Sequence, residues 1–220
     1  MVARKNFENE LEGLHNELSL MGVCVEKAID DIFFFFLYQD IELITAIKNG
    51  DRVVDDMEKS IEAKCLSLIT RQQPVARDLR VVSATLKVVT DIERIGDHAA
   101  DIAEVALRCK DVNIYHVAEQ MPALIMCAKQ MVHEAVDIFI QRDEVNAQKI
   151  IDMDDEVDEL FNQVKNNLVR SLKEEKIDAD VLVDILMIAK YLERIGDHAT
   201  NICEWSIFRE TGSVDNVRLL

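Results

Sequence analysis

The heptapeptide Glu-Arg-Ile-Gly-Asp-His-Ala occurs twice in the chain, at residues 93–99 and, 100 positions later, at residues 193–199. Seven identical residues at a fixed offset indicate an internal duplication, because so long a repeat does not arise by chance. We therefore expect two related units, which we assign to residues 1–112 and 113–220. The fold of one unit should recur in the other.

Apolar residues recur at helical spacing through most of the chain, and the composition favours an all-α fold. Of the 220 residues 49% are hydrophobic, with only two prolines and six glycines to interrupt regular structure. This spacing predicts amphipathic helices, and we expect two tandem, sequence-related three-helix bundles with short polar links. The six helices are predicted near residues 11–50, 51–70, 78–109, 122–138, 143–173 and 180–209.

The heptapeptide places acids on one side of a helix. At 100° per residue, four acids of the first copy fall within an arc of about 80°, opposite the apolar residues of the same helix: Glu93, Asp97, Asp101 and Glu104. The second copy repeats three of them as Glu193, Asp197 and Glu204, and has Asn201 in place of the fourth. Gly96 and Gly196 fall between acids and core, which predicts close approach of a neighbouring helix.

The helix before each heptapeptide carries acids of its own. In the first unit four acids share an arc of about 60° beside the apolar stripe: Asp51, Asp55, Glu58 and Glu62. In the second unit, Asp154 and Asp158 match Glu58 and Glu62 at an offset of 96, which predicts a gain of four residues before the second heptapeptide. Each unit thus offers acidic rows on two helices that can face one spot.

Two interpretations of these acidic rows are open. Like charges stacked at i,i+4 destabilise a helix by a few tenths of a kcal/mol per pair, so a bound cation would explain why they occur in both units. An all-oxygen site favours hard cations such as Mg²⁺, Mn²⁺, Ca²⁺ or ferric iron. Alternatively, the rows are solvated faces whose partners are the nearby Arg94 and Lys59.

Charge and composition exclude several functional classes. A formal net charge of −17 argues against nucleic acid binding and against docking on an anionic leaflet. The longest apolar run, residues 32–38, is far shorter than the roughly 20 residues of a membrane span, so we expect no membrane insertion. The five cysteines are odd in number and lack a C-x-x-C pair, which predicts buried thiols in a reducing cytosol.

The doubled heptapeptide, together with Gln-Pro-Val-Ala-Arg-Asp-Leu-Arg at residues 73–80, resembles the PhoU family of phosphate-transport regulators over nearly the whole chain. The resemblance implies a cytoplasmic homodimer that acts as a negative regulator of phosphate uptake and phosphate-starvation signalling. Its implied partners are the ATPase of the phosphate ABC transporter and a sensor histidine kinase.

The resemblance also implies metal-ion clusters held by paired E(D)-x-x-x-D motifs, with iron favoured and zinc, manganese or magnesium as alternatives. In the first unit the implied ligands are Glu58, Glu62, Glu93, Asp97 and Asp101. In the second they are Asp154, Asp158, Glu193, Asp197 and Asn201. Because Asn201 lacks a charge, we expect the second site to bind metal more weakly.

Two other functions compete with this one. A metal-dependent hydrolase or oxidase would use the same acids, but the sequence has no Ser/His/Asp set, no Gly-rich phosphate loop and no reactive-cysteine context. The di-iron spacing Glu-x-x-His is missing too. We therefore do not expect an enzyme. A purely structural helical module would use the acids for solubility alone.

Several other side chains carry alternative roles. His98 and His198 could ligate metal, but a hydrogen bond to a neighbouring helix is favoured. Arg77 and Arg80 could grip phosphate, but ion pairs with the many acids are favoured.

The run Phe33-Phe34-Phe35-Phe36 combines core and outer positions. Phe35 and Phe36 are expected in the core. Phe34 either contacts a partner or is covered by the second bundle.

Overall fold

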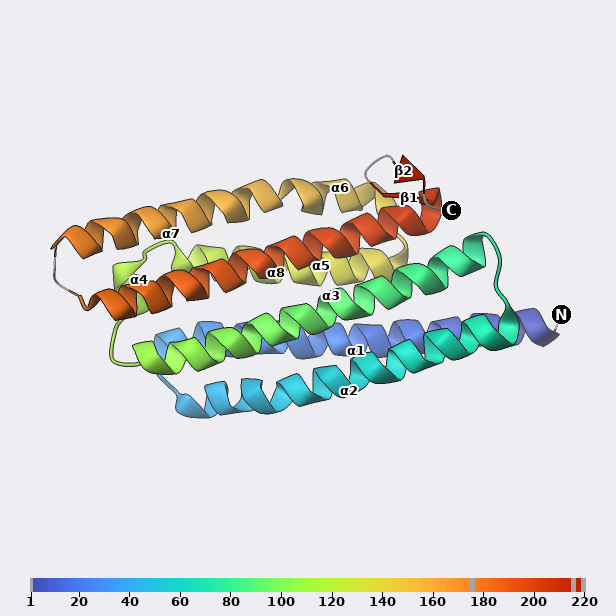
Figure 1. The fold of residues 1–220 in the computed structure, drawn as a ribbon, viewed down its shortest axis with the longest axis horizontal. Helices are drawn as coiled ribbons and strands as arrows, with labels where there is room; N and C mark the ends of the chain where they lie inside the picture. Colours follow the sequence, from blue (N-terminus) through green and yellow to red (C-terminus); the bar gives the residue numbers. More distant parts are fainter. Residues whose placement is uncertain (1, 175–176, 215–216, 219–220) are drawn as a thin grey trace.

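The computed structural model describes residues 2–174, 177–214 and 217–218, with side chains from residues 5–174 and 177–214. Its long helices run along the longest axis of the molecule (Figure 1). The first repeat comprises α1 (Val2–Tyr38), α2 (Ile41–Gln72) and α3 (Arg77–Ala106). The second comprises α5 (Met121–Gln141), α6 (Glu144–Asp152), α7 (Asp154–Glu174) and α8 (Ala179–Thr211). The predicted all-α fold is confirmed.

Short elements complete the chain. The repeats are joined through a 3₁₀ turn, η1 (Leu107–Cys109), and a one-turn helix, α4 (Ile114–Val117). After α8, two-residue strands pair antiparallel, β1 (Ser213–Val214) with β2 (Val217–Arg218). No described helix has a stretch apolar and long enough to cross a bilayer.

The first link differs from the sequence prediction. α1 ends at Tyr38, whereas the sequence predicts an end at Asn49–Gly50, and that prediction is wrong. Gln39 takes a left-handed backbone conformation with φ of 58°, and the Asp40 side chain accepts a hydrogen bond from the N–H two residues on, at 2.9 Å. Such an N-cap satisfies a free donor of the first helical turn. Gly50 therefore lies inside α2.

The fifth predicted helix is divided into α6 and α7 at Met153. The Met153 N–H bonds to the carbonyl of Ile150, three residues back, at 3.1 Å. This tightened turn shifts from α-helical to 3₁₀ spacing. α7 therefore starts at Asp154, and its first turn contains Asp154, Asp155 and Glu156, where the helix dipole stabilises negative charge.

The core follows the predicted apolar stripes. Buried positions of α1 include Leu11, Leu14, Leu18, Met21, Val25, Ile32 and Phe35. α3 and α8, which carry the two heptapeptides, form the most extensive contact between any two elements and lie side by side at the centre of the molecule (Figure 1). The repeats thus pack together mainly through the helices that contain the repeated sequence. All five cysteines are free, and only Cys24 is not fully buried.

The two glycines of the heptapeptides sit where neighbouring helices come close. A Cβ at Gly96 would lie 3.2 Å from Cγ1 of Val54 in α2, and one at Gly196 would lie 3.3 Å from Cγ1 of Val157 in α7. Both distances are tighter than ordinary van der Waals contact. The predicted close approach is confirmed at both positions.

The phenylalanine run lies near the end of α1. Phe35 and Phe36 are buried, as predicted. Phe34 is 42% exposed and stacks on Tyr38, with ring centroids 6.2 Å apart. The second bundle therefore does not cover Phe34.

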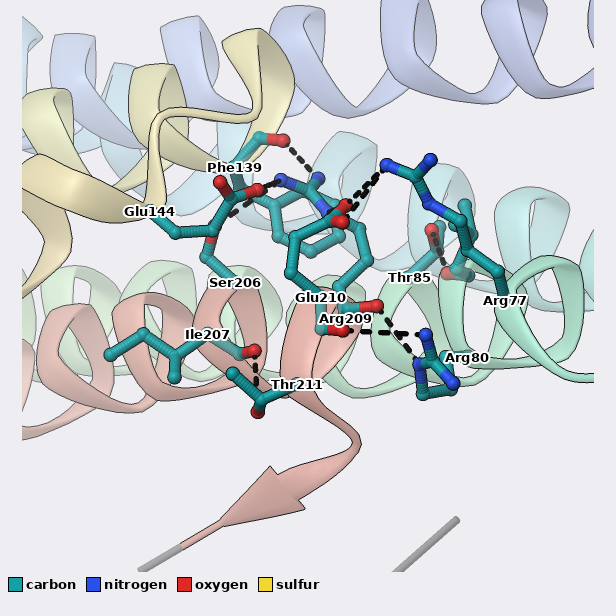
Figure 2. A network of polar contacts seen from close by, with 11 residues as sticks. Arg77, Arg80, Thr85, Phe139, Glu144, Ser206, Ile207, Arg209, Glu210 and Thr211 are labelled. Carbon is teal, nitrogen blue, oxygen red and sulfur yellow. Dashed lines mark hydrogen bonds and ion pairs between the residues drawn. The ribbon is translucent and has the colours of Figure 1, made fainter.

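A buried arginine anchors the C-terminal end of α8 (Figure 2). The Arg209 side chain has no exposed surface, and its guanidinium lies over the Phe139 ring, 4.7 Å from the centroid. It donates to the Phe139 carbonyl and, at 3.1 Å, to Oε1 of Glu144. These contacts fix the end of α8 to the end of α5 and the start of α6.

Candidate metal centres

The first centre lies between α2 and α3. Asp51 and Asp55 of α2 and Asp97 of α3 each place one carboxylate oxygen within 4.8 Å of the others. Among the described residues, no other group of three His, Cys, Asp or Glu side chains meets this criterion. Glu93 lies one turn before Asp97 on α3 and is mostly buried, at 14% side-chain exposure. The heptapeptide thus supplies one wall of an acidic cluster and α2 the other.

Burial and mutual repulsion make this cluster costly without a cation. The pKa of Glu93 is raised to about 7 by burial and by the negative charges of Asp97 and Glu58. The pKa of Asp51 is raised by burial and then by Asp97 and Asp55. Glu93 Oε2 and Asp51 Oδ1 are buried without a hydrogen-bond partner. Buried carboxylate oxygens that make no hydrogen bond and lie near further carboxylates fit a hard cation, which prefers several oxygen ligands.

The basic partners of the alternative interpretation are also present. Arg94 pairs with Asp97 at 2.6 Å and with Glu93 at 3.4 Å, and Lys59 pairs with Asp55 at 3.6 Å. Both basic side chains are more than half exposed. Exposed ion pairs contribute only about 0–1 kcal/mol, so a multivalent cation could displace them.

The remaining predicted residues of the first unit lie around this cluster. The pKa of Glu58 is raised by burial and then by Glu62, which places these two acids beside each other on α2. Asp101 is half exposed and borders an open cavity of about 390 Å³ that Asp51 and Asp97 also line. Asp51 and Asp55 form the triad with Asp97, although the residues predicted as ligands from α2 are Glu58 and Glu62.

The second centre lies between α7 and α8. The pKa of Asp154, the first residue of α7, is raised to about 6 by burial and then by Asp197, Asp158 and Glu193. The other three acids predicted for this unit are therefore close enough to repel the Asp154 carboxylate. Glu193 also pairs with Lys190, one turn away on α8. Together they form a second, looser acidic cluster.

Helix packing fixes which residues of the two repeats correspond. Val54 faces Gly96 and Val157 faces Gly196, so α2 and α7 are related by an offset of 103 and not by 96. Asp154 and Asp158 therefore correspond to Asp51 and Asp55, and the match to Glu58 and Glu62 is wrong. The second repeat is shorter than the first between these helices, by three residues, instead of longer.

Asn201, predicted as a ligand of the second centre, contacts the other repeat. Its Nδ2 donates a hydrogen bond at 3.1 Å to Oδ1 of Asp91, a buried residue of α3 in the first repeat. Asp91 was not predicted as a functional residue, and no pattern within its own repeat marks it. Its role follows only from the contact between α3 and α8.

The two histidines also lie at this contact. His198 Nδ1 is 2.9 Å from Asp91 Oδ1, the predicted bond to a neighbouring helix. The His98 ring lies 5.5 Å from that of His198 and 5.6 Å from that of Tyr191. Its Nδ1 is buried without a hydrogen-bond partner, and burial lowers its pKa, with His198 and Arg194 adding to the shift.

Arg77 and Arg80 hold the end of α8 (Figure 2). Arg77 donates two hydrogen bonds to the Glu210 carboxylate, at 2.9 and 3.0 Å. Arg80 donates to the backbone carbonyls of Arg209 at 3.1 Å and Glu210 at 3.3 Å. The favoured ion pairing is confirmed for Arg77, while Arg80 binds the backbone.

Comparison with known proteins places the repeat in a family. The PhoU domain pattern matches the chain twice, at residues 18–106 and 124–206. The chain belongs to the PhoU family. A PhoU homolog of Clostridium acetobutylicum, named a phosphate-specific transport system accessory protein, is 39% identical over 96% of this chain and 97% of its own length. A homolog of Thermotoga maritima is 30% identical over 96% of this chain and 92% of its own length.

Solved PhoU structures share the fold. The crystal structure of PhoU from Pseudomonas aeruginosa is 31% identical, covers 94% of this chain and all of its own, and superposes with a TM-score of 0.88. The phosphate transport system regulatory protein PhoU from Streptococcus pneumoniae is 25% identical, covers 96% of this chain and all of its own, and gives 0.87. The tandem helical repeat predicted from the heptapeptide is thus that of PhoU proteins.

Proposed function

We propose that this protein is an accessory regulator of phosphate transport that restrains phosphate uptake and starvation signalling when phosphate is plentiful. The observation that carries the proposal is full-length similarity to proteins named as phosphate-specific transport accessory proteins, at up to 39% identity. We propose a non-enzymatic role.

The acidic centres give the regulator a cation-binding function. The triad of Asp51, Asp55 and Asp97, with Glu93 beside it, offers only carboxylate oxygens. Such a donor set suits hard cations, and we propose iron, with manganese, magnesium or zinc as alternatives. When bound, the cation would neutralise the repulsion within the cluster and tie α2 to α3. The centre of the second repeat would do the same for α7 and α8.

The proposed partners are the ATPase of the phosphate transporter, a sensor histidine kinase and a second copy of the chain. Support comes from the family membership and from the names of the relatives, which associate them with the phosphate-specific transport system. An adaptor of this kind needs surfaces for two proteins, and two similar bundles packed side by side along α3 and α8 could each offer one.

Two experiments test the proposal separately. Deletion of the gene in its own host should raise phosphate uptake in phosphate-rich medium, and unchanged uptake would refute the regulatory role. Elemental analysis of protein purified from that host should find metal, and Glu93→Gln with Asp97→Asn should reduce the metal content per chain. The matched control is Glu8→Gln with Glu12→Gln, two acids of α1 far from the centre. If the control and the centre variant retain equal metal, the site assignment is wrong.

A further inference from the structure

A cluster of polar side chains joins α3 to α8 where the two repeats meet. Asp91 of α3 is 9% exposed, and its Oδ1 accepts the hydrogen bond from Asn201 Nδ2 at 3.1 Å. His198 Nδ1 lies 2.9 Å from the same oxygen. Two side chains about one turn apart on α8 therefore converge on a single carboxylate oxygen of α3.

The corresponding contact in the opposite direction lacks these bonds. Tyr191 occupies the position equivalent to Asp91, and its ring packs 5.6 Å from the His98 ring. Asp101 occupies the position equivalent to Asn201, and its Oδ2 is 3.8 Å from His98 Nδ1, beyond hydrogen-bond distance. At this pair of equivalent positions the hydrogen bonding is therefore one-sided, and α8 bonds α3 at Asp91.

This contact ties α3 to α8 two residues before Glu93. Asp91 lies on the same helix as Glu93 and Asp97, whose carboxylates lie near acids of α2. An α-helix with its side chains has a radius of about 5–6 Å, so a rotation of roughly 10° moves a surface carboxylate by about 1 Å. Binding groups need to be held within about 0.5 Å of their productive positions. A change at Asp91 that turned α3 would therefore move Glu93 and Asp97 out of position.

We propose that Asn201 and His198 of the second repeat are positioning residues for the cation centre of the first repeat, acting through Asp91. The inference rests on the proposed cation-binding function. It also accounts for the departure from the acidic pattern at Asn201, because an aspartate there would set a second carboxylate against Asp91. Removal of a partner that bonds a metal ligand directly typically weakens metal binding by about 10–100-fold, and because Asn201 and His198 act one step further out, we expect the lower end of this range.

The test uses full-length protein in which Asp154→Asn and Asp158→Asn remove the second centre, so that Mn²⁺ titration by calorimetry reports the first centre alone. Asn201→Asp, which opposes Asp91 with a like charge, should weaken Mn²⁺ binding about 10-fold. In the double variant, Asn201→Asp with Asp91→Asn, the two side chains again offer one amide donor and one carboxylate acceptor. The Mn²⁺ affinity should then return to within about threefold of that of the starting protein. The matched control is Thr200→Val, because the Thr200 hydroxyl is buried without a hydrogen-bond partner. It should leave the affinity unchanged.

Each outcome decides between the possibilities. The positioning role is overturned if Asn201→Asp leaves the Mn²⁺ affinity unchanged, or if adding Asp91→Asn does not restore that affinity. Either result leaves the proposed function standing. A starting protein that binds neither Mn²⁺ nor Fe²⁺ overturns the cation-binding function and this inference together. Circular dichroism melting establishes that each variant is folded. Should Asn201→Asp not fold, Asn201→Ala removes the donor without adding charge, and the same loss of affinity is expected.

Discussion

At the scale of single residues, the effect of a charge depends on what surrounds it. Arg209 is fully buried against Phe139 and Glu144. Arg77 makes two hydrogen bonds to Glu210, but its side chain is 62% exposed. Removing one partner of a buried ion pair leaves the other uncompensated, whereas an exposed pair competes with water and salt. The two arginines of one network should therefore differ greatly in their contribution to stability.

Arg209→Leu should lower the free energy of unfolding by about 3–5 kcal/mol, because Glu144 and the Phe139 carbonyl lose their buried donor. Arg77→Leu should lower it by only about 0–1 kcal/mol. Urea denaturation followed by circular dichroism measures both. Equal losses from the two substitutions would contradict the role assigned to burial.

His15 of α1 should give the protein a pH-dependent stability. Burial lowers its pKa to about 4, and the charges of Arg142 and Arg209 add to the shift. The unfolded state, with a histidine pKa near 6.5, takes up the proton first as the pH falls. The contribution of neutral His15 to the free energy of unfolding is therefore complete above about pH 6.5, and it is lost as the pH falls toward about 4.

At about pH 5 this loss should amount to about 1–2 kcal/mol, and His15→Gln should remove it. The measurement is the free energy of unfolding of parent and variant at several pH values from about 7 to about 5. The difference between the two proteins isolates His15 from the acidic clusters, whose raised pKa values act in the opposite direction. A difference that stays constant with pH would show that His15 is protonated equally in both states.

At the scale of helices, a glycine can lie at a close contact with a neighbouring helix or at a position where no other atoms are near. Gly96 and Gly196 allow α2 and α7 to approach. A Cβ at Gly22 of α1 would lie 2.9 Å from Cγ1 of Val136 in α5, closer than the atoms can tolerate without movement. At Gly50 of α2 nothing lies within 4 Å. The same substitution should therefore have opposite effects at Gly22 and Gly50.

Gly50→Ala should raise the free energy of unfolding by about 0.5–1 kcal/mol, because alanine has the higher helix propensity and meets no neighbour. Gly22→Ala should lower it by about 1–3 kcal/mol through overpacking against Val136. Thermal and urea denaturation of the two single variants provide the comparison. Stabilisation by Gly22→Ala would mean that α1 and α5 separate easily.

Helix periodicity predicts most of this fold because it is a local property, while the site depends on packing between distant segments. The acidic rows on α2, α3, α7 and α8 are all visible in the sequence. Their register is visible too, because an offset of 103 pairs Asp51, Val54 and Asp55 with identical residues, whereas an offset of 96 pairs only similar ones. The contacts of Val54 and Val157 with the glycines confirm 103. The destination of Asn201, by contrast, is set by the contact between repeats. The end of α1 could have been predicted from Asp40, because aspartate is a preferred N-cap and so marks the start of the next helix.

At the scale of the whole molecule, exposed apolar side chains gather where α1 meets α2. Phe34, Leu37, Tyr38 and Ile41 are 42, 46, 72 and 53% exposed. Phe34 and Tyr38 stack on each other, which holds both rings in one orientation. We call these four residues the α1–α2 apolar cluster. Because no part of the described chain covers it, we expect it to contact a second copy or another protein.

Phe34→Ser should weaken self-association by tens-fold without loss of helicity, because burying such a ring contributes about 1.5–3 kcal/mol and about 1.4 kcal/mol changes a dissociation constant tenfold. Sedimentation equilibrium measures the dissociation constant. Phe35→Ser, one residue on and fully buried, should instead unfold the bundle. Val145→Ser is the control for an exposed apolar residue, since Val145 of α6 is 89% exposed and lies outside the cluster. It should change neither property. An unaltered dissociation constant in Phe34→Ser would place the contact between copies elsewhere, and a parent protein that stays monomeric would leave the cluster to a different partner.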